Sequence, residues 1–290
     1  MKLVQYKQGD ECGIGLVLEK GIIDIKELLS FRENIFVTMD DLIRGEGTDL
    51  INQALAGPRA EDYGYMREDD LEFLPVVSQP EKIICVGLNY MEHIPESLNK
   101  DTIPKEPLLF GKFNNALAGH REKIVLPRNG IEHDYEAELV IIIGKKGKNV
   151  AVDCALDYAF GYTIGNDLST RELQRVSSQW FLGKSLDQFA PIGPYLVTAD
   201  EVNPDHLDIR LSRNGQVMQD SNTRHMIFSC AEIISYLSQY MTLQPGDVIF
   251  SGTPEGVILG HAPEDREWLK PGDVLEVEIE GVGKLVNELI

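Results

Sequence analysis

The chain has 290 residues, of which 43% are hydrophobic and 26% charged, a composition typical of globular proteins and unlike that of disordered or fibrous chains. Its formal net charge of −20 argues against nucleic acid and anionic membrane surfaces as partners, because an acidic surface repels both. An anionic substrate must therefore meet a local concentration of positive charge.

The four cysteines are widely spaced and include no CxxC pair, which fits a reducing compartment better than a disulfide framework. The N-terminal segment turns polar too early for a secretory signal. No apolar stretch approaches the ~20 residues that a membrane span needs. We therefore expect a soluble, cytoplasmic protein that binds neither membranes nor nucleic acid.

Residues 1–75 are expected to form a small N-terminal α+β domain. Strands are predicted at Leu3–Tyr6, Gly15–Leu18 and Ile22–Ile25, and helical patterns extend through Asp40–Ala56. Prolines in the segment that follows predict an extended linker, because the residue before a proline is biased away from the helix.

Residues 76–290 are expected to form a second, strand-rich domain that carries the chemistry. Helices are predicted only about Thr170–Arg175 and Phe228–Gln239. Many strands with few helices favour a mixed, mainly β (α+β) fold over a doubly wound sheet. The predicted strands are Ile83–Val86, Leu108–Phe110, Leu139–Ile143, Phe160–Ile164, Tyr195–Val197, Leu207–Leu211, Val248–Ser251 and Val274–Ile279.

The sharpest local feature is the motif DYEAELVIIIG, which begins at Asp134. Side chains alternate along a strand, so Asp134, Glu136 and Glu138 share one face. Carboxylates that lead into a buried apolar strand are costly unless a cation or hydrogen-bond donors compensate. Carboxylate oxygens are hard ligands and suit Mg²⁺, Mn²⁺ or Ca²⁺. The alternative is an acidic edge strand that faces solvent, as the net charge would predict.

A third acid, Asp167, closes the motif GYTIGND at the end of a predicted strand. Ser169 and Glu172, which follow it, have capping-box spacing and predict the start of a short helix. The side chain of Asp167 therefore points to whatever lies at the strand end. An ordinary Asx-turn is the alternative for this aspartate.

Positive and polar side chains follow these acids. Arg171, Gln174 and Arg175 fall on adjacent positions of the first helical turns, where they form either a positive field for an anionic substrate or a solvated surface. Lys184 lies in the apolar run WFLGKSLD, where a partly buried ammonium is available to stabilise an oxyanion. The GKS triplet is no Walker motif, because Ser178 stands where the required glycine would be.

His93 and Glu96 are spaced i,i+3 in the run NYMEHIPE, which follows a predicted strand. On a helical turn the two side chains would touch, and the carboxylate would orient the imidazole. A lone exposed histidine is the alternative.

Taken together and in this order, the motifs resemble the fumarylacetoacetate hydrolase superfamily from about residue 80 to the C-terminus. The matching runs are IICVGLNYMEH, DYEAELVIIIGK, GYTIGNDLSTRELQ, GKSLDQFAPIGP, LSQYMTLQPGDVIFSGTPEGV and LKPGDVLEVEIEGVG. The resemblance implies a catalytic domain of the mixed β-roll type and a homodimer. Residues 1–75 resemble the variable first domain of these enzymes less specifically.

The resemblance also implies a metal site. Mg²⁺ or Mn²⁺ would be held by Glu136, Glu138 and Asp167, with water and substrate in the remaining positions. Lys184 would lie beside the metal.

Further residues are assigned roles by the same resemblance. Arg171 and Gln174 would grip the substrate, and Thr253, in the turn SGTPEGV, would hold its carboxylate. His93 and Glu96 would be the pair that activates water. The proline between them departs from the family pattern, because small helix-forming residues are more usual there.

Within the superfamily, QWFLGKSLDQFAPIGP and ISYLSQYMTLQPGD look most like hydrolases of 2,4-dioxo deoxysugar acids. We therefore predict a divalent-metal-dependent hydrolase that cleaves a C–C bond in a 2,4-dioxo acid of the acylpyruvate type and releases pyruvate or a related 2-oxo acid. The alternative is a lyase or isomerase on the same scaffold, either an oxaloacetate decarboxylase or a hydratase or isomerase of homoprotocatechuate catabolism. A catalytically silent metal-binding or ligand-sensing protein is a third hypothesis, disfavoured because every acid, the lysine and the histidine are present.

Overall fold

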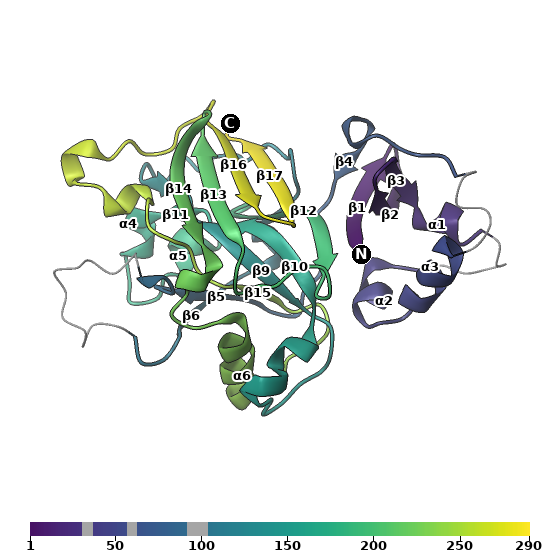
Figure 1. Ribbon diagram of the computed structural model, residues 1–290. Helices are drawn as coiled ribbons and strands as arrows, with labels where there is room; N and C mark the ends of the chain where they lie inside the picture. The colour runs from purple at the N-terminus through teal and green to yellow at the C-terminus, as the bar shows by residue number, and fades with distance from the viewer. Residues whose placement is uncertain (31–36, 57–62, 92–103) are drawn as a thin grey trace.

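The computed structural model describes residues 1–30, 37–56, 63–91 and 104–290. Strands outnumber helices in the described residues, and the fold is α+β with a large mixed sheet (Figure 1). That sheet has the order β3-β2-β1-β12-β10-β9-β15-β5-β6, with β4 paired to β1 and β7 paired to β12. The predicted fold class is confirmed. None of the helices in these ranges is long and apolar enough to cross a membrane.

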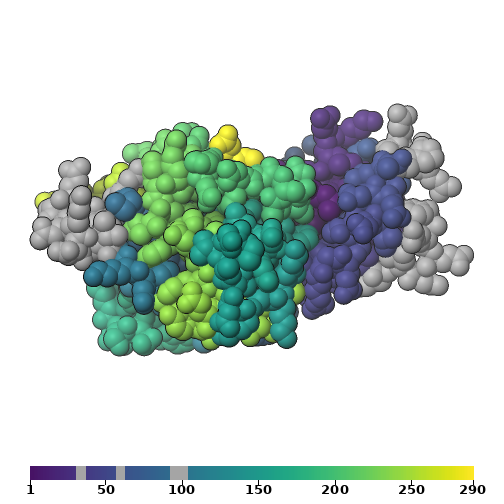
Figure 2. Space-filling view, turned by 60° about the horizontal axis from the view of Figure 1, so that its bottom comes forward, coloured from purple at the N-terminus to yellow at the C-terminus, as the bar shows by residue number. Residues whose placement is uncertain are grey.

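The N-terminal elements lie on one side of the molecule (Figures 1 and 2). They are β1 (Lys2–Gln8), β2 (Glu11–Leu18), β3 (Gly21–Asp24), α1 (Ile25–Leu28), α2 (Met39–Ile43), α3 (Thr48–Leu55), the 3-10 turn η1 (Glu68–Asp70) and β4 (Glu72–Phe73). Strand β1 pairs with β12 through Leu3 and Leu196, so the sheet continues across the predicted boundary near residue 75. The division into residues 1–75 and 76–290 stays a prediction.

The helical pattern predicted through Asp40–Ala56 is divided into two short helices. Gly45 and Gly47, between α2 and α3, have φ angles of 83° and 97°. This left-handed conformation suits glycine and cannot continue a right-handed helix. Ile25 begins α1 instead of ending a strand, because the Asp24 carboxylate caps that helix by accepting from Lys26 N at 2.6 Å.

The remaining elements build the second part of the chain. In the large sheet these are β5 (Ile83–Gly87), β6 (Leu108–Lys112), β7 (Leu117–Ala118), β9 (Ala137–Ile143), β10 (Ala159–Asn166), β12 (Ala190–Thr198) and β15 (Val248–Phe250). A four-stranded sheet has the order β14 (Gln216–Asn222), β13 (Asp208–Arg213), β16 (Val274–Ile279), β17 (Gly283–Glu288), and β8 (His133–Asp134) pairs with β11 (Ser169–Thr170). The helices are α4 (Arg171–Gln174), α5 (Phe181–Lys184) and α6 (Cys230–Tyr240), and the 3-10 turns are η4 (Asn114–Ala116), η5 (Val152–Tyr158), η6 (Thr223–His225), η7 (Ile258–Gly260) and η8 (Pro263–Asp265).

Strand β9 is the centre of the fold and carries the acidic motif. All seven of its residues are buried, and it pairs antiparallel with both β10 and β15. The alternative of a solvent-facing acidic edge strand is therefore wrong. The side chains of Leu139 and Ile141 join one core with Ile209 and Leu211 of the four-stranded sheet, which packs against β9, β10 and β12. Full burial of each such side chain stabilises the fold by roughly 1.5–3 kcal/mol.

The predicted capping box at Ser169 does not form. Ser169 belongs to β11, and α4 begins at Arg171 without a side-chain cap. The Glu172 carboxylate instead accepts hydrogen bonds from the backbone amides of Ile131 and Glu132, the latter at 3.0 Å. This contact binds α4 to the segment that enters β8, and it fixes the position of the arginine at the start of the helix.

Candidate metal and substrate site

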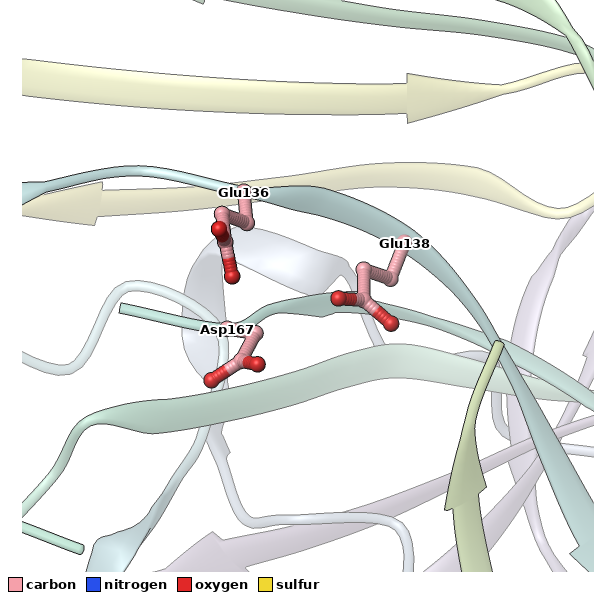
Figure 3. A group of neighbouring side chains, drawn as sticks. All are labelled: Glu136, Glu138 and Asp167. Carbon is pink, nitrogen blue, oxygen red and sulfur yellow. The ribbon is translucent and has the colours of Figure 1, made fainter. Parts of the chain in front are cut away.

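Three carboxylates from neighbouring strands converge in a cavity of about 640 Å³. Glu136 precedes β9, Glu138 lies within it, and Asp167 follows β10 (Figure 3). Each side chain offers an oxygen atom, and these atoms lie within 4.8 Å of one another. The described lining of the cavity is Val86, Gly87, Leu88, Phe110, Glu136, Glu138, Asp167, Arg171, Gln174, Trp180, Lys184, Met218, Asp220, Thr253, Glu255, Gly256, Val257, Leu259, Gly260 and His261.

Antiparallel pairing explains why acids far apart in the sequence meet. Strand β10 pairs with β9 up to Asn166 and Ala137. The pairing continues beyond the strand end, because Asp167 N donates to Glu136 O at 2.9 Å and Glu136 N donates to Asn166 Oδ1 at 2.9 Å. The two acids therefore lie on directly adjacent segments, both buried.

Cationic side chains surround these acids. Lys184 is 2% exposed, and its Nζ donates to Glu136 Oε2 and, at 2.7 Å, to Asp167 Oδ2. Arg171 Nη2 donates to Glu136 Oε1 at 2.7 Å. Lys112 Nζ lies 2.6 Å from Asp167 Oδ1 and donates to two backbone carbonyls, Leu168 O at 3.0 Å and Phe189 O at 2.5 Å.

The two glutamates have opposite electrostatic environments. Burial by itself opposes ionisation of Glu136, but Arg171 and Lys184 outweigh it and hold the pKa of this carboxyl below its usual range. Burial raises the pKa of Glu138 well above its usual range, and the nearby charges of Asp167 and Glu136 raise it further. The charge of Lys184 and a hydrogen bond of 2.6 Å from Gly252 N to Glu138 Oε2 offset only part of this effect on the pKa. Of the three carboxylates, Glu138 is thus the one without a direct ion pair to a cationic side chain of the described residues.

The donor set fits a divalent cation. Asp167 Oδ1 is buried and accepts no hydrogen bond from the described residues, although Lys112 lies within ion-pair distance. Glu138 is 2% exposed and faces two other carboxylates. A cation between three acidic side chains would satisfy both groups, and oxygen ligands of this kind suit Mg²⁺, Mn²⁺ or Ca²⁺. The group contains no thiolate or imidazole, so zinc is the poorer match.

Arg171 lines the cavity, and its guanidinium is bound to protein groups. Its Nε donates to Asp134 Oδ2 at 2.8 Å and its Nη1 donates to Gln174 Oε1 at 3.1 Å, besides the contact with Glu136. Asp134 also accepts from the backbone amides of Ile258 at 2.8 Å and of Leu259 at 3.0 Å. These bonds link the wall of the cavity at η7 to the metal-site acids through Asp134 and Arg171.

Thr253 and Gln174 also line the cavity. Thr253 Oγ1 accepts a hydrogen bond of 2.9 Å from Gln219 Nε2. A hydroxyl that accepts in this way keeps its own proton for donation to a ligand. Arg175, which the sequence grouped with Arg171, lies at the surface and pairs with Glu132 instead.

The structure brings together Glu136, Glu138, Asp167, Arg171, Gln174, Lys184 and Thr253 from the predicted site. His93 and Glu96 lie outside the described residues, so their pairing stays a prediction. Three features of the site were not predicted from the sequence. They are the contact of Lys112 with Asp167, the hydrogen bond from the Gly252 amide to Glu138, and the bridge that Asp134 forms. A lysine at the end of the apolar strand LLFGK is the signal that could have identified Lys112, as it identified Lys184.

Known proteins with similar sequences and structures include enzymes that act on 2-oxo acids. The chain is 38% identical over 299 residues to "Oxaloacetate tautomerase FAHD2A, mitochondrial" of Bos taurus, a match that covers 100% of this chain and 92% of the relative. The solved structure of a fumarylacetoacetate hydrolase from Exiguobacterium antarcticum is similar, with a TM-score of 0.86 and 32% identity over 100% of this chain and 99% of that chain. A maleylpyruvate hydrolase from Sphingobium sp. SYK-6, solved in complex with manganese(II) and pyruvate, has a TM-score of 0.80 and 30% identity over 100% and 99% of the two chains.

The expectation of a cytoplasmic location is contradicted. The tautomerase of Bos taurus, which matches the full length of this chain, is named as mitochondrial. The cysteine spacing on which the expectation rested is compatible with either compartment, because both are reducing.

The sequence profile described as "Fumarylacetoacetate (FAA) hydrolase C-terminal" matches residues 82–290, which include every described residue of the site. The relatives named above match over the whole chain. The chain is therefore an enzyme that belongs to the fumarylacetoacetate hydrolase family.

Proposed function

We propose that the chain is a divalent-metal-dependent isomerase that interconverts the keto and enol forms of a 2-oxo acid, with oxaloacetate as the substrate. The observation that carries this proposal is the contact of the buried Lys184 ammonium with Glu136 and Asp167, inside the group of three carboxylates. The name of the bovine relative supports keto–enol isomerisation over the C–C hydrolysis that the motifs first suggested.

Keto–enol interconversion moves one proton. A C–H bond at C3 breaks, an O–H bond forms at the C2 oxygen, and no water is consumed. Negative charge develops on that oxygen as the C3 proton leaves. A divalent cation, when bound, supplies Lewis-acid stabilisation of this charge. Lys184 acts on the same oxygen as a preoriented donor, which is effective because its position is already fixed before the reaction.

Neighbouring side chains orient the acid. The free hydroxyl proton of Thr253 donates to the substrate carboxylate, because Gln219 already occupies the acceptor side of this hydroxyl. The Gln174 amide nitrogen is a second donor, since its oxygen is held by Arg171. The family resemblance makes His93 and Glu96 the pair that activates water, and for isomerisation we propose His93 as the base at C3 instead.

The metal that we propose is Mg²⁺ or Mn²⁺. Three buried carboxylates with no sulfur or imidazole ligand form a hard-oxygen site. The manganese(II) and pyruvate bound to the maleylpyruvate hydrolase support a 2-oxo acid at such a site.

The test follows the enol by ultraviolet absorbance. Enol-oxaloacetate is added to chelator-treated protein, to the same protein reloaded with Mn²⁺ or Mg²⁺, and to metal alone as the blank. We expect faster enol decay only in the reloaded protein, with no pyruvate release. Lys184→Met should lower the rate by about 10²-fold or more, while Lys284→Met, at an exposed ion pair with Glu276, should leave it unchanged.

The outcomes separate the related reactions. No acceleration over the metal blank would refute the isomerase. Rapid pyruvate release from oxaloacetate would identify a decarboxylase.

C–C hydrolysis is the second candidate function, and similarity to a maleylpyruvate hydrolase favours it. Under this alternative His93 activates water, and general-base assistance contributes roughly 10²–10⁴-fold. His93→Ala should then reduce acylpyruvate cleavage by at least ~10²-fold, while any oxaloacetate decarboxylation, which needs no water, changes much less. Cleavage of acylpyruvates without any oxaloacetate isomerisation would replace the isomerase assignment.

A further inference from the structure

One wall of the cavity is aromatic and begins beside the carboxylates. The ring centroids of Phe110, on β6, and Trp180, before α5, are 5.2 Å apart and the rings are tilted by 59°. Lys184 Nζ lies 4.8 Å from the Phe110 centroid. The ammonium that contacts Glu136 and Asp167 is therefore adjacent to this wall. A ligand with its head group at the carboxylates would place its tail against Phe110 and Trp180.

The backbone at the end of β5 supports the position of this wall. A Cβ atom at Gly87 would lie 2.9 Å from Trp180 Cζ3 and 3.0 Å from Leu108 Cδ2, so glycine is required for the indole to lie this close. The next residue, Leu88, has a φ of 55°, which is uncommon for leucine, and it lines the cavity with 44% of its surface exposed. This conformation adds an apolar side chain to the wall.

Beyond the carboxylates, much of the described lining is apolar. Its lysine and arginine, Lys184 and Arg171, are both paired with buried acids. Asp220 pairs with Arg210 at 3.0 Å, and Glu255 and His261 are exposed. Met218, Val257 and Leu259 add further apolar surface. The tail of a bound acid therefore meets mainly apolar groups.

We propose that Leu88, Phe110 and Trp180 form a subsite through which the same site, besides oxaloacetate, accepts 2-oxo acids that carry an apolar, planar substituent at C3. Phenylpyruvate is the simplest such acid. The inference rests on the proposed function, because the 2-oxo acid head group must lie at the carboxylates. Aromatic rings attract one another at centroid separations of 4.5–7 Å, and the enol of an arylpyruvate is planar and conjugated. The cavity volume of about 640 Å³ is in the range of pockets that enclose ligands much larger than a four-carbon acid.

The test compares binding of two acids with the same head group, so it does not depend on turnover. Calorimetry on Mn²⁺-loaded protein measures the Kd of pyruvate and of phenylpyruvate. We expect phenylpyruvate to bind at least ~10-fold more tightly, as burial of a phenyl group against two rings implies. Trp180→Leu should reduce this ratio to about 3 or less. The control Phe113→Leu should leave the ratio unchanged, because Phe113 is a 58% exposed ring that contacts Phe181 edge to face, outside the described lining.

A second variant covers the case in which Trp180→Leu does not fold. Leu88→Ala removes an exposed side chain, so the fold should tolerate it, and we expect the ratio to fall by about 2-fold or more. Pyruvate binding with no preference for phenylpyruvate would overturn the subsite and leave the proposed function intact. Failure of pyruvate itself to bind would overturn the proposed function and the subsite with it. Oxaloacetate binding more tightly than phenylpyruvate, with the advantage lost in His261→Gln, would show a second-carboxylate subsite in place of the aromatic one.

Discussion

Removal of the Lys184 ammonium tests whether a metal and this lysine share the three carboxylates. Lys184→Met keeps the apolar stem and the contact surface with Phe110, and it removes the donor to Glu136 and Asp167. Loss of one partner from a buried ion pair costs about 3–5 kcal/mol. The lower end applies, because Glu136 keeps Arg171 and Asp167 keeps Lys112.

A loss of about 3 kcal/mol corresponds to a decrease in Tm of about 6–12 °C for a chain of this size. The assay is thermal unfolding of both proteins in chelator and in saturating Mn²⁺. We expect Lys184→Met to show the full decrease in Tm in chelator and a much smaller decrease in Mn²⁺, because the divalent cation then neutralises the same carboxylates. Calorimetry should also show tighter Mn²⁺ binding by the variant, since a competing positive charge is gone.

The control for this experiment is Lys284→Met. Its ion pair with Glu276 is exposed at the surface, and such pairs contribute roughly 0–1 kcal/mol. A deficit in Lys184→Met that is the same with and without Mn²⁺, together with weaker Mn²⁺ binding, would refute the shared site.

Three further predictions concern the metal ligand, a buried histidine and assembly. Glu138→Gln should weaken Mn²⁺ binding by at least ~10²-fold in calorimetry, because a direct ligand loses its charge; unchanged affinity would remove Glu138 from the site. Burial lowers the pKa of His120 from 6.5 to about 4, so the native state resists protonation that the unfolded chain accepts, and stability is complete above pH 6.5 and decreases as the pH falls toward 4. Urea unfolding should show about 2 kcal/mol less stability at pH 5 than at pH 7 from this group, and His120→Gln, which keeps an acceptor for Val286 N, should reduce that loss. Sedimentation should give twice the 32.5 kDa chain mass for the predicted homodimer, and a single species at the chain mass would contradict it.

The strands that frame the site were predictable because their residues carry a strong pattern. The run AELVIII is buried on both faces, so its continuous apolar character marked β9 and the acids that precede it. Strand β14 was not predicted from the sequence. In the structure Asn214 and Gly215, with φ angles of 53° and 79°, form the turn that joins it to β13. An Asn-Gly pair between strands is a hairpin signal, and it would have identified β14.

The partners of the acids were less predictable than the acids themselves. Arg171 was expected at the substrate, and the structure pairs it with Asp134 and Glu136. Spacing within a helix gives no information about which distant segment faces it, because that depends on the pairing of β8 with β11. The reaction was the least predictable property, since hydrolysis and isomerisation use the same head group and the same ligands.

The pairing of β1 with β12 has a consequence for the solubility of shortened forms of this protein. All nine residues of β12 are buried, and its backbone groups at Tyr195–Val197 are covered by β1. Removal of the first strand would leave an open, apolar sheet edge, which is a template for pairing with another chain. Strand β1 thus protects this edge of the large sheet from pairing with another chain. A fragment that begins at residue 76 is expected to aggregate, even though it contains every described residue that lines the cavity.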